Sequence, residues 1–214
     1  MKILKNIVIA LVVLVAALAL IGMLLPSTSK VERSLVINAP AEVIFDQVND
    51  LKKNEAWSPW KDPTMVLTYG SVTEGKGAVS SWTSKDMGAG SMTIVESTPA
   101  SAIDIDLDFG GMGQAKALWR FAPEGEGIKV TETMTSDAGM NPAKRLMSLM
   151  SDKMVGPYFE KGLASLKTVS EARAAEIEKE KAATAQAAAI PAEEAAPAGS
   201  PAAVPTPVPA VKAK

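Results

Sequence analysis

The chain contains 214 residues, with 22 Lys and Arg against 24 Asp and Glu, and with no Cys and no His. This length fits one ordinary domain with additional segments, and it excludes a large multidomain enzyme. The formal charge is -2 at pH 7, and neither sign is clustered along the chain strongly enough to indicate a nucleic-acid surface, so we expect no nucleic-acid partner. The absence of Cys and His excludes disulfides, thiolate catalysis and the usual transition-metal ligands, so we expect no metal and no cofactor. Any catalysis would have to use carboxylate, Tyr, Lys or Arg side chains.

Residues 1–29 predict an N-terminal transmembrane anchor. The run from Ile7 to Leu25 is 19 residues long and carries no charge, which nearly matches a hydrocarbon core of about 30 Å. Lys2 and Lys5 precede the run, so we expect a cytoplasmic N-terminus and an exported remainder. A cleaved signal peptide is the alternative, with Ala17-Leu18-Ala19 as its cleavage site, but the run is long for a signal core and favours a retained signal anchor.

Residues 30–170 predict an α+β domain. A strand at Val31–Asn38 runs directly into a helix that begins near Pro40. Six further strands alternate apolar and polar residues between Gly- or Pro-bearing turns: Met65–Tyr69, Ala78–Ser84, Ser91–Ser97, Ala102–Phe109, Ala117–Phe121 and Ile128–Thr135. Asn141-Pro142 then opens a long helix through about Val169. This order predicts a curved antiparallel sheet that is covered by the terminal helix.

Strand alternation predicts which side chains face that helix. The candidates are Leu67, Tyr69, Trp82, Met92, Ile94, Ile105, Leu107, Phe109, Trp119, Phe121, Val130 and Met134. An apolar stripe on the helix is expected to face them, made of Leu146, Met147, Met150, Met154, Tyr158 and Leu166. Methionine is flexible and polarizable, so its three copies in this stripe fit either an irregular core or an adaptable pocket. The arrangement leaves room for an internal hydrophobic cavity.

The same alternation places a carboxylate among these apolar residues. Glu132 shares the inner face, where it would be strongly desolvated unless paired, and Glu96 shares it by the same count near a strand end. Glu132 is therefore a candidate acid or base, and Tyr69 or Tyr158 could donate a hydrogen bond to a ligand carbonyl. The alternative for Glu132 is a shifted strand register, or a position at the cavity mouth beside a Lys or Arg.

Asp104, Asp106 and Asp108 point to the opposite face of their strand. A spacing of two on a strand is typical of a solvated face, and hard cations usually bind ligands that converge from a loop. The pattern therefore favours a solvated face over a metal site.

Trp57 and Trp60 lie in a short Pro-containing loop after the first helix of the domain. They could gate the cavity, contact the bilayer interface where Trp is enriched, or plug one end of the core. The sequence leaves these three interpretations open.

Two stretches of the domain are distinctive: VERSLVINAPAEVIFDQVNDLKKNEAWSPW at 31–60 and NPAKRLMSLMSDKMVGPYFEKGLASLK at 141–167. In both, the chain resembles the START-related (SRPBCC) superfamily, and specifically its membrane-anchored bacterial members of the polyketide cyclase/dehydrase-like type. The resemblance implies a helix-grip fold, in which a seven-stranded antiparallel sheet wraps the C-terminal helix and encloses a hydrophobic ligand cavity. It also implies a single-pass protein of the bacterial inner membrane. It implies no one activity, because the superfamily contains lipid carriers, receptors, cyclases and oxygenase subunits.

Residues 171–214 predict a tail, because they are rich in Ala, Glu, Lys and Pro and contain no aromatic residue. Its first part can extend the preceding helix to about Ile190, and the prolines from Pro191 onward favour a disordered, extended spacer.

Three functional hypotheses follow. The first is an anchored extracytoplasmic domain that binds an apolar small molecule or lipid without chemistry, through the inner-face residues above together with Trp57, Trp60, Glu132, Met147, Met150, Met154 and Tyr158. The second is a cyclase or dehydratase that uses a cavity carboxylate, with Glu132, Tyr69 and Tyr158 as candidates. The third is a structural module that acts through its tail. The ligand and the oligomeric state remain open.

Overall fold

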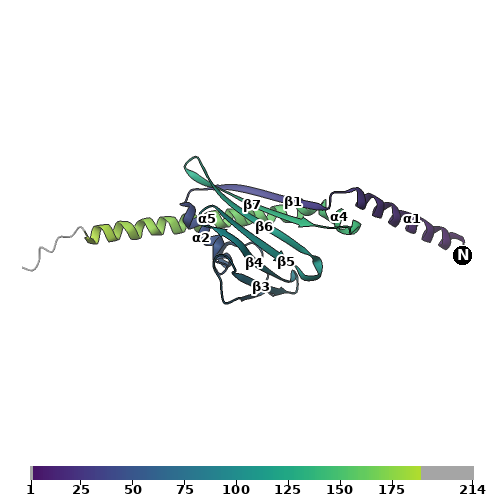
Figure 1. Ribbon diagram of the computed structural model, residues 1–214, viewed down its shortest axis with the longest axis horizontal. Coiled ribbons are helices and arrows are strands. Elements are labelled where there is room, and N and C mark those ends of the chain that lie inside the picture. Colours follow the sequence, from purple (N-terminus) through teal and green to yellow (C-terminus); the bar gives the residue numbers. More distant parts are fainter. Residues whose placement is uncertain (1, 189–214) are drawn as a thin grey trace, which may run out of the picture. The chain divides into compact units, whose positions relative to one another are not determined.

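The computed structural model describes residues 2–188 of the chain. Its helical elements are α1 (Lys2–Leu24), α2 (Ala41–Asn49), α3 (Asn54–Trp57), the single 3-10 turn η1 (Gly110–Met112), α4 (Pro142–Ser148) and α5 (Ser151–Ala188). Its strands are β1 (Thr28–Ile37), β2 (Val66–Tyr69), β3 (Val79–Ser84), β4 (Gly88–Thr98), β5 (Ala102–Asp108), β6 (Gln114–Glu124) and β7 (Gly127–Asp137). The seven strands form one sheet, and Figure 1 shows α5 passing behind them. The predicted helix-grip architecture is confirmed.

The strand order in the sheet is β1-β7-β6-β5-β4-β3-β2, and all neighbours are antiparallel. Strands β2 to β7 therefore form a meander, and β1 pairs with the last strand. The predicted faces are confirmed in register: Ile105 lies opposite Ile94 on β4 and Ala117 on β6. All three side chains are buried on the face that α5 covers.

One strand departs from simple alternation. Between Ile94 and Glu96 the register of β4 against β5 shifts, so that Glu96 lies opposite Asp104 on the outer face. The Glu96 carboxylate accepts a hydrogen bond of 2.9 Å from Lys76 Nζ. The prediction that Glu96 shares the inner face is wrong, because a β-bulge inserts one residue and reverses the alternation beyond it.

The hydrophobic core lies where α2 and the middle of α5 cover the sheet. Aromatic pairs join the layers edge to face, with ring centroids of Phe45 and Phe121 5.8 Å apart and those of Trp57 and Trp119 5.5 Å apart. The Trp57 indole N–H donates a hydrogen bond of 3.0 Å to the backbone carbonyl of Gln47. Trp57 therefore plugs one end of the core, which was one of its three possible roles.

The predicted long helix is interrupted near its start. Asn141 caps α4 as expected, because its side-chain oxygen accepts from the backbone N–H groups of Ala143 and Lys144. However, α4 ends at Ser148 and α5 begins at Ser151, so one predicted helix is two.

The buried stripe of α5 also differs from the prediction. The helix buries Phe159, Leu163 and Leu166, whereas Met147, Met150 and Met154 are exposed by 68%, 55% and 59%. The predicted packing of these methionines on the sheet is therefore wrong. Met154 lies on a different side of α5 from Phe159, Leu163 and Leu166, and Met147 and Met150 precede α5, in α4 and in the break between the two helices.

Helix α1 is long and apolar enough to cross a membrane, by length and composition. Its C-terminal end packs against α4. A Cβ atom on Gly22 would lie 2.5 Å from the carbonyl oxygen of Pro142, so only glycine permits this approach. Arg145 Nη1 donates hydrogen bonds to the carbonyl oxygens of Met23 (2.8 Å) and Leu25 (3.1 Å). These carbonyls end the helix and would otherwise lack partners within it.

The chain divides into two units after Ile177, within α5. The first unit contains the sheet and its core, and the second contains the end of α5. As the composition predicts, α5 continues past residue 170, to Ala188. The predicted extended spacer from Pro191 onward lies outside the described residues.

Candidate functional site

The inner face of the sheet has a buried end and a partly exposed end. Towards α2 it is closed by the core residues described above. At the other end six apolar or aromatic side chains are only half-buried, and Leu67 is 37% exposed; the six are Tyr69, Trp82, Met92, Leu107, Phe109 and Met134. All seven are among the predicted ligand-binding residues. The structure therefore places a set of incompletely covered apolar side chains on this part of the inner face.

Trp82 and Phe109 shape this exposed end. Their ring centroids lie 5.9 Å apart at 65°, which is an edge-to-face contact. The Trp82 indole lies directly over Gly90, since a Cβ atom there would approach the ring to 2.3 Å. A glycine opposite a tryptophan thus lets a large flat ring lie on the sheet.

Glu132 lies on β7, next to Trp119 of β6 and Arg33 of β1 in the register. Its side chain is on the inner face, as predicted, and the residue is only 8% exposed. Among the described residues it makes no hydrogen bond or ion pair. Burial raises the pKa of Glu132 to about 8, because the charged carboxylate loses its hydration without gaining a partner. At neutral pH this side chain is predominantly a neutral carboxylic acid, which can donate a hydrogen bond.

Arg33 does not pair with Glu132. Its guanidinium instead donates hydrogen bonds of 2.8 Å each to Asp152 and Glu160 of α5. The Arg33 guanidinium holds the pKa of Asp152 below its ordinary value. A Cβ atom on Gly156 would lie 2.2 Å from Arg33 Nη2. Arg33 therefore lies flat against the helix and ties β1 to α5.

The contact of Arg33 with Asp152 and Glu160 was not predicted from the sequence, although the sequence contains two signals of it. The alternation of β1 places Arg33 on the inner face, and Gly156 interrupts an otherwise helical stretch. A cation on an inner face together with a glycine in the covering helix indicates a close approach between the two.

The two candidate tyrosines lie elsewhere. The Tyr69 hydroxyl donates a hydrogen bond to the carboxylate of Glu55. Burial, and to a lesser degree this hydrogen bond, raises the pKa of Tyr69. Tyr158 stacks on Trp60, with ring centroids 4.4 Å apart and planes 8° apart. Strands β2 and β7 are five steps apart in the sheet, roughly 24 Å when measured along it. Within the described residues, no hydrogen bond joins Glu132 to either tyrosine.

The outer face of the sheet is polar and carries the predicted aspartates. Asp104 accepts from Arg120 Nη1 (2.6 Å) and Asp106 from Lys116 Nζ (2.7 Å). Asp108 accepts from the backbone N–H of Gly110 at 2.7 Å. These contacts identify a solvated strand face with paired charges.

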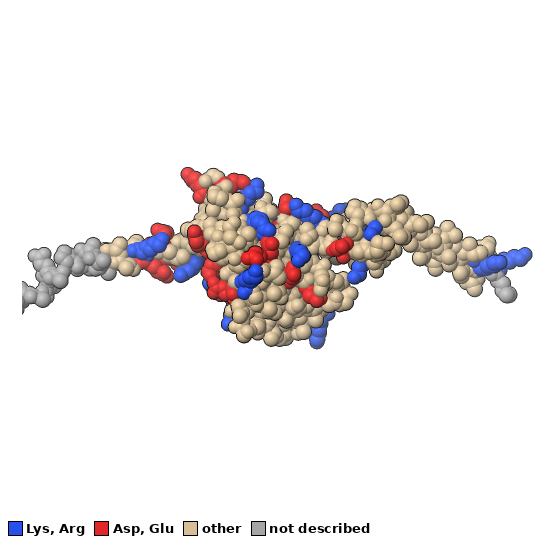
Figure 2. Space-filling view, viewed as in Figure 1, with Lys and Arg blue, Asp and Glu red and all other residues tan. Residues whose placement is uncertain are grey.

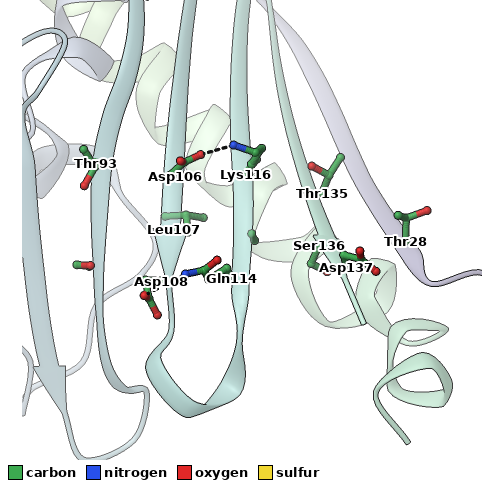
Figure 3. Close-up of a pocket in the computed structure, with 12 residues that line it drawn as sticks. Thr28, Thr93, Asp106, Leu107, Asp108, Gln114, Lys116, Thr135, Ser136 and Asp137 are labelled. Atoms are coloured by element: carbon green, nitrogen blue, oxygen red, sulfur yellow. Dashed lines mark hydrogen bonds and ion pairs between the residues drawn. The ribbon is translucent and has the colours of Figure 1, made fainter. Parts of the chain in front are cut away.

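A hollow of about 480 Å³ opens on this outer face, as Figure 3 shows with helical ribbons behind the strands. Its lining is mostly hydroxyl, amide and charged side chains: Thr28, Ser91, Thr93, Asp106, Leu107, Asp108, Gln114, Ala115, Lys116, Thr135, Ser136 and Asp137. Leu107 alone belongs to the predicted ligand-binding set. The hollow is open, and its charged pair, Asp106 and Lys116, is already satisfied.

Comparison with known proteins shows similarity to one protein family and to several proteins of related sequence or fold. The family described as "Polyketide cyclase / dehydrase and lipid transport" matches residues 28–171. The "Ribosome association toxin RatA" of Pseudomonas aeruginosa is 26% identical over 118 residues, which cover 51% of this chain and 76% of that protein.

Solved structures share the fold at low identity. A protein of unknown function, SA2116 from Staphylococcus aureus, superimposes with a TM-score of 0.54 at 10% identity, over 68% of this chain and 95% of that chain. The di-domain ARO/CYC StfQ from the steffimycin biosynthetic pathway gives a TM-score of 0.53 at 15% identity, over 69% of this chain and 52% of that chain. At these identities the likeness shows a common fold.

Proposed function

The chain belongs to the polyketide cyclase / dehydrase and lipid transport family, and from this premise we propose that it binds an apolar small molecule or lipid against the inner face of its sheet. The observation that carries the proposal is the exposed end of that face, where aromatic, Leu and Met side chains are left incompletely covered. Burying one such side chain fully is worth roughly 1.5–3 kcal/mol, so a ligand that covers several of them gains substantial affinity.

The proposed site has three parts. Its apolar surface is formed by Leu67, Tyr69, Trp82, Met92, Leu107, Phe109 and Met134. Behind this surface lie the buried members of the predicted set, Trp57, Ile94, Ile105, Trp119, Phe121 and Val130, which support it. The remaining members of the predicted set are the exposed side chains Trp60, Met147, Met150, Met154 and Tyr158. Glu132 supplies one hydrogen-bonding group to a ligand that carries a polar atom.

We further propose that α1 anchors this domain in the bacterial inner membrane with the domain on the extracytoplasmic side. The length and apolar character of α1 support the span, and Lys2 and Lys5 at its N-terminal end support the orientation. Only three residues separate Leu24 at the end of α1 from Thr28 at the start of β1. The domain would therefore lie close to the membrane surface, where an apolar ligand is abundant.

The binding proposal is tested on a fragment of residues 27–188, which contains every residue of the hydrophobic core cluster. The fragment is exported through a heterologous signal, and native mass spectrometry with organic extraction identifies any apolar molecule that co-purifies. The delipidated fragment is then titrated with the apolar fluorophore N-phenyl-1-naphthylamine.

Two leucines provide matched variants for this titration. Leu107 is half-buried on the inner face, and Leu118 is half-buried on the outer face opposite Asp104. We expect Leu107→Gln to weaken fluorophore binding by about tenfold, the loss of one buried leucine contact, and Leu118→Gln to leave it unchanged. No co-purifying molecule and no saturable binding, or equal effects of the two variants, would contradict the proposal.

Glu132 favours a second candidate function, a cyclase or dehydratase. A carboxylic acid whose pKa is raised to about 8 can protonate a leaving hydroxyl group near neutral pH. The test is incubation with a linear poly-β-carbonyl compound, with loss of water followed by mass spectrometry. Turnover that is abolished in Glu132→Gln with binding retained supports the enzyme. Absence of turnover in the wild-type chain with binding intact supports the non-catalytic binding module.

A further inference from the structure

Six large apolar side chains are exposed where η1, α4 and the start of α5 meet. This methionine rim consists of Met112, Met140, Met147, Leu149, Met150 and Met154, which are exposed by 55–75%. Lys144 of α4 connects its parts, because its Nζ donates to the carbonyl oxygen of Met112 in η1. A soluble domain has no physical reason to leave so many long apolar side chains uncovered on adjoining elements.

The rim lies at the C-terminal end of α1. Gly22 of α1 contacts Pro142, the first residue of α4, and Arg145 binds the last carbonyl groups of α1. The backbone N–H of Ala138 also donates a hydrogen bond of 2.7 Å to the carbonyl of Ser27. These contacts hold the rim beside the point at which the chain would leave the bilayer.

The charges around the rim favour a lipid surface. Between residues 140 and 154 the chain carries the cations Lys144, Arg145 and Lys153 against one anion, Asp152, which is paired with Arg33. In Figure 2 the surface over α1 and α4 is mostly uncharged, whereas acidic and basic residues gather over the strands. Apolar side chains with flanking Lys and Arg are the composition of segments that lie in the membrane interface.

We infer that the methionine rim inserts into the interface of the same bilayer that α1 spans, so that the domain rests on the membrane through α4 and the start of α5. The inference rests on the membrane anchor of the proposed function. Because α1 already holds the rim at the bilayer, the effective concentration is high and a weak intrinsic affinity is sufficient for insertion.

This placement would connect the bilayer to the proposed ligand site. Phe109 immediately precedes η1, and Leu107 lies two residues earlier on β5. The exposed end of the inner face therefore adjoins the rim, and an apolar molecule could pass between lipid and protein without crossing water. Methionine suits this edge, since it adapts to apolar partners of different shape.

The experiment uses the full chain, which contains no Cys, so that a single introduced Cys is labelled uniquely. Three variants are labelled with bimane and reconstituted in vesicles of phosphatidylcholine and phosphatidylglycerol: Met150→Cys in the rim, Ser101→Cys in the exposed β4–β5 turn, and Val12→Cys within α1. Acyl-brominated phosphatidylcholine then quenches any label that reaches the hydrocarbon boundary. Circular dichroism confirms that each labelled variant is folded.

We expect strong quenching at residue 12, and quenching at residue 150 that exceeds that at residue 101 by at least about threefold. If residue 12 is quenched while residues 150 and 101 respond equally, the rim inference is overturned and the anchor stands. If residue 12 is not quenched, the anchor in the proposed function fails, and with it the bilayer as the partner of the rim.

Discussion

Glu132 is the residue whose chemistry departs most from its ordinary behaviour. A carboxyl group that is 8% exposed and has no partner among the described residues is costly to ionise. Its pKa is about 8 in the folded chain against an ordinary value of 4.5. Between these two values the unfolded chain releases a proton that the folded chain keeps. The free energy of unfolding therefore decreases as pH rises from 4.5 to 8, by up to about 5 kcal/mol.

Glu132→Gln should remove this pH dependence, because the amide has a similar shape and does not ionise. We expect the variant to be more stable than the wild-type chain at pH 8, with the difference shrinking towards pH 5. Urea unfolding of both proteins across this pH range measures the effect. Glu126→Gln, in the exposed turn between β6 and β7, is the matched control and should follow the wild-type profile. A wild-type profile in Glu132→Gln would show that the carboxyl group is ionised or paired.

Gly90 is a second residue with a defined role, since the Trp82 ring occupies the space of its absent side chain. We expect Gly90→Ala to displace the indole and to destabilise the fold by about 1–3 kcal/mol. Chemical denaturation and the tryptophan emission maximum report the two effects. Ala89→Ser, at the neighbouring exposed position, should change neither quantity.

At the scale of elements, Arg33 and Gly156 join β1 to α5. A methyl group at residue 156 would lie 2.2 Å from the Arg33 guanidinium, so the guanidinium must shift, which weakens its hydrogen bonds to Asp152 and Glu160. We expect Gly156→Ala to destabilise the fold by less than about 1 kcal/mol, because the ion pairs that it weakens are largely exposed. In an Arg33→Ala background the same substitution should cost little, because the clash is gone. A double-mutant cycle by urea unfolding measures this coupling, and additive effects of the two substitutions would contradict the close contact.

The elements themselves are largely predictable from the sequence. Alternation with a period of two gives the seven strands and the faces of residues such as Ile105 and Glu132, because a half-buried sheet requires it. The same rule fails at Glu96, where the bulge is set by pairing with β5 and leaves no local pattern. The helical stripe predicted for the methionines of α4 and α5 is also wrong, because apolar residues on two sides of a helix do not reveal which side the sheet selects. The inner-face positions of the half-buried side chains on β2 to β5 and on β7 were therefore predictable, whereas the exposure of the methionines on α4 and α5 was not.

At the scale of the whole molecule, the domain is closed at one end of its sheet and incompletely covered at the other. The closed end contains the aromatic pairs of Phe45 and Trp57, and the other end adjoins α4 and the exit of α1. An apolar ligand, a bilayer anchor and the methionine rim would then share one end of the domain. This arrangement predicts that a ligand contacts the inner face and leaves the polar hollow on the outer face unoccupied.

The position of a bound ligand tests most directly whether an apolar molecule binds the inner face of the sheet. We would record methyl and amide NMR spectra of residues 27–188, with labelled methionine, during titration with N-phenyl-1-naphthylamine. We predict that the methyl resonances of Met92 and Met134 on the inner face shift and saturate together, while the amide resonances of Thr93 and Lys116 on the outer face do not shift. Saturable shifts confined to Thr93, Lys116 and the other residues of the outer hollow would contradict it.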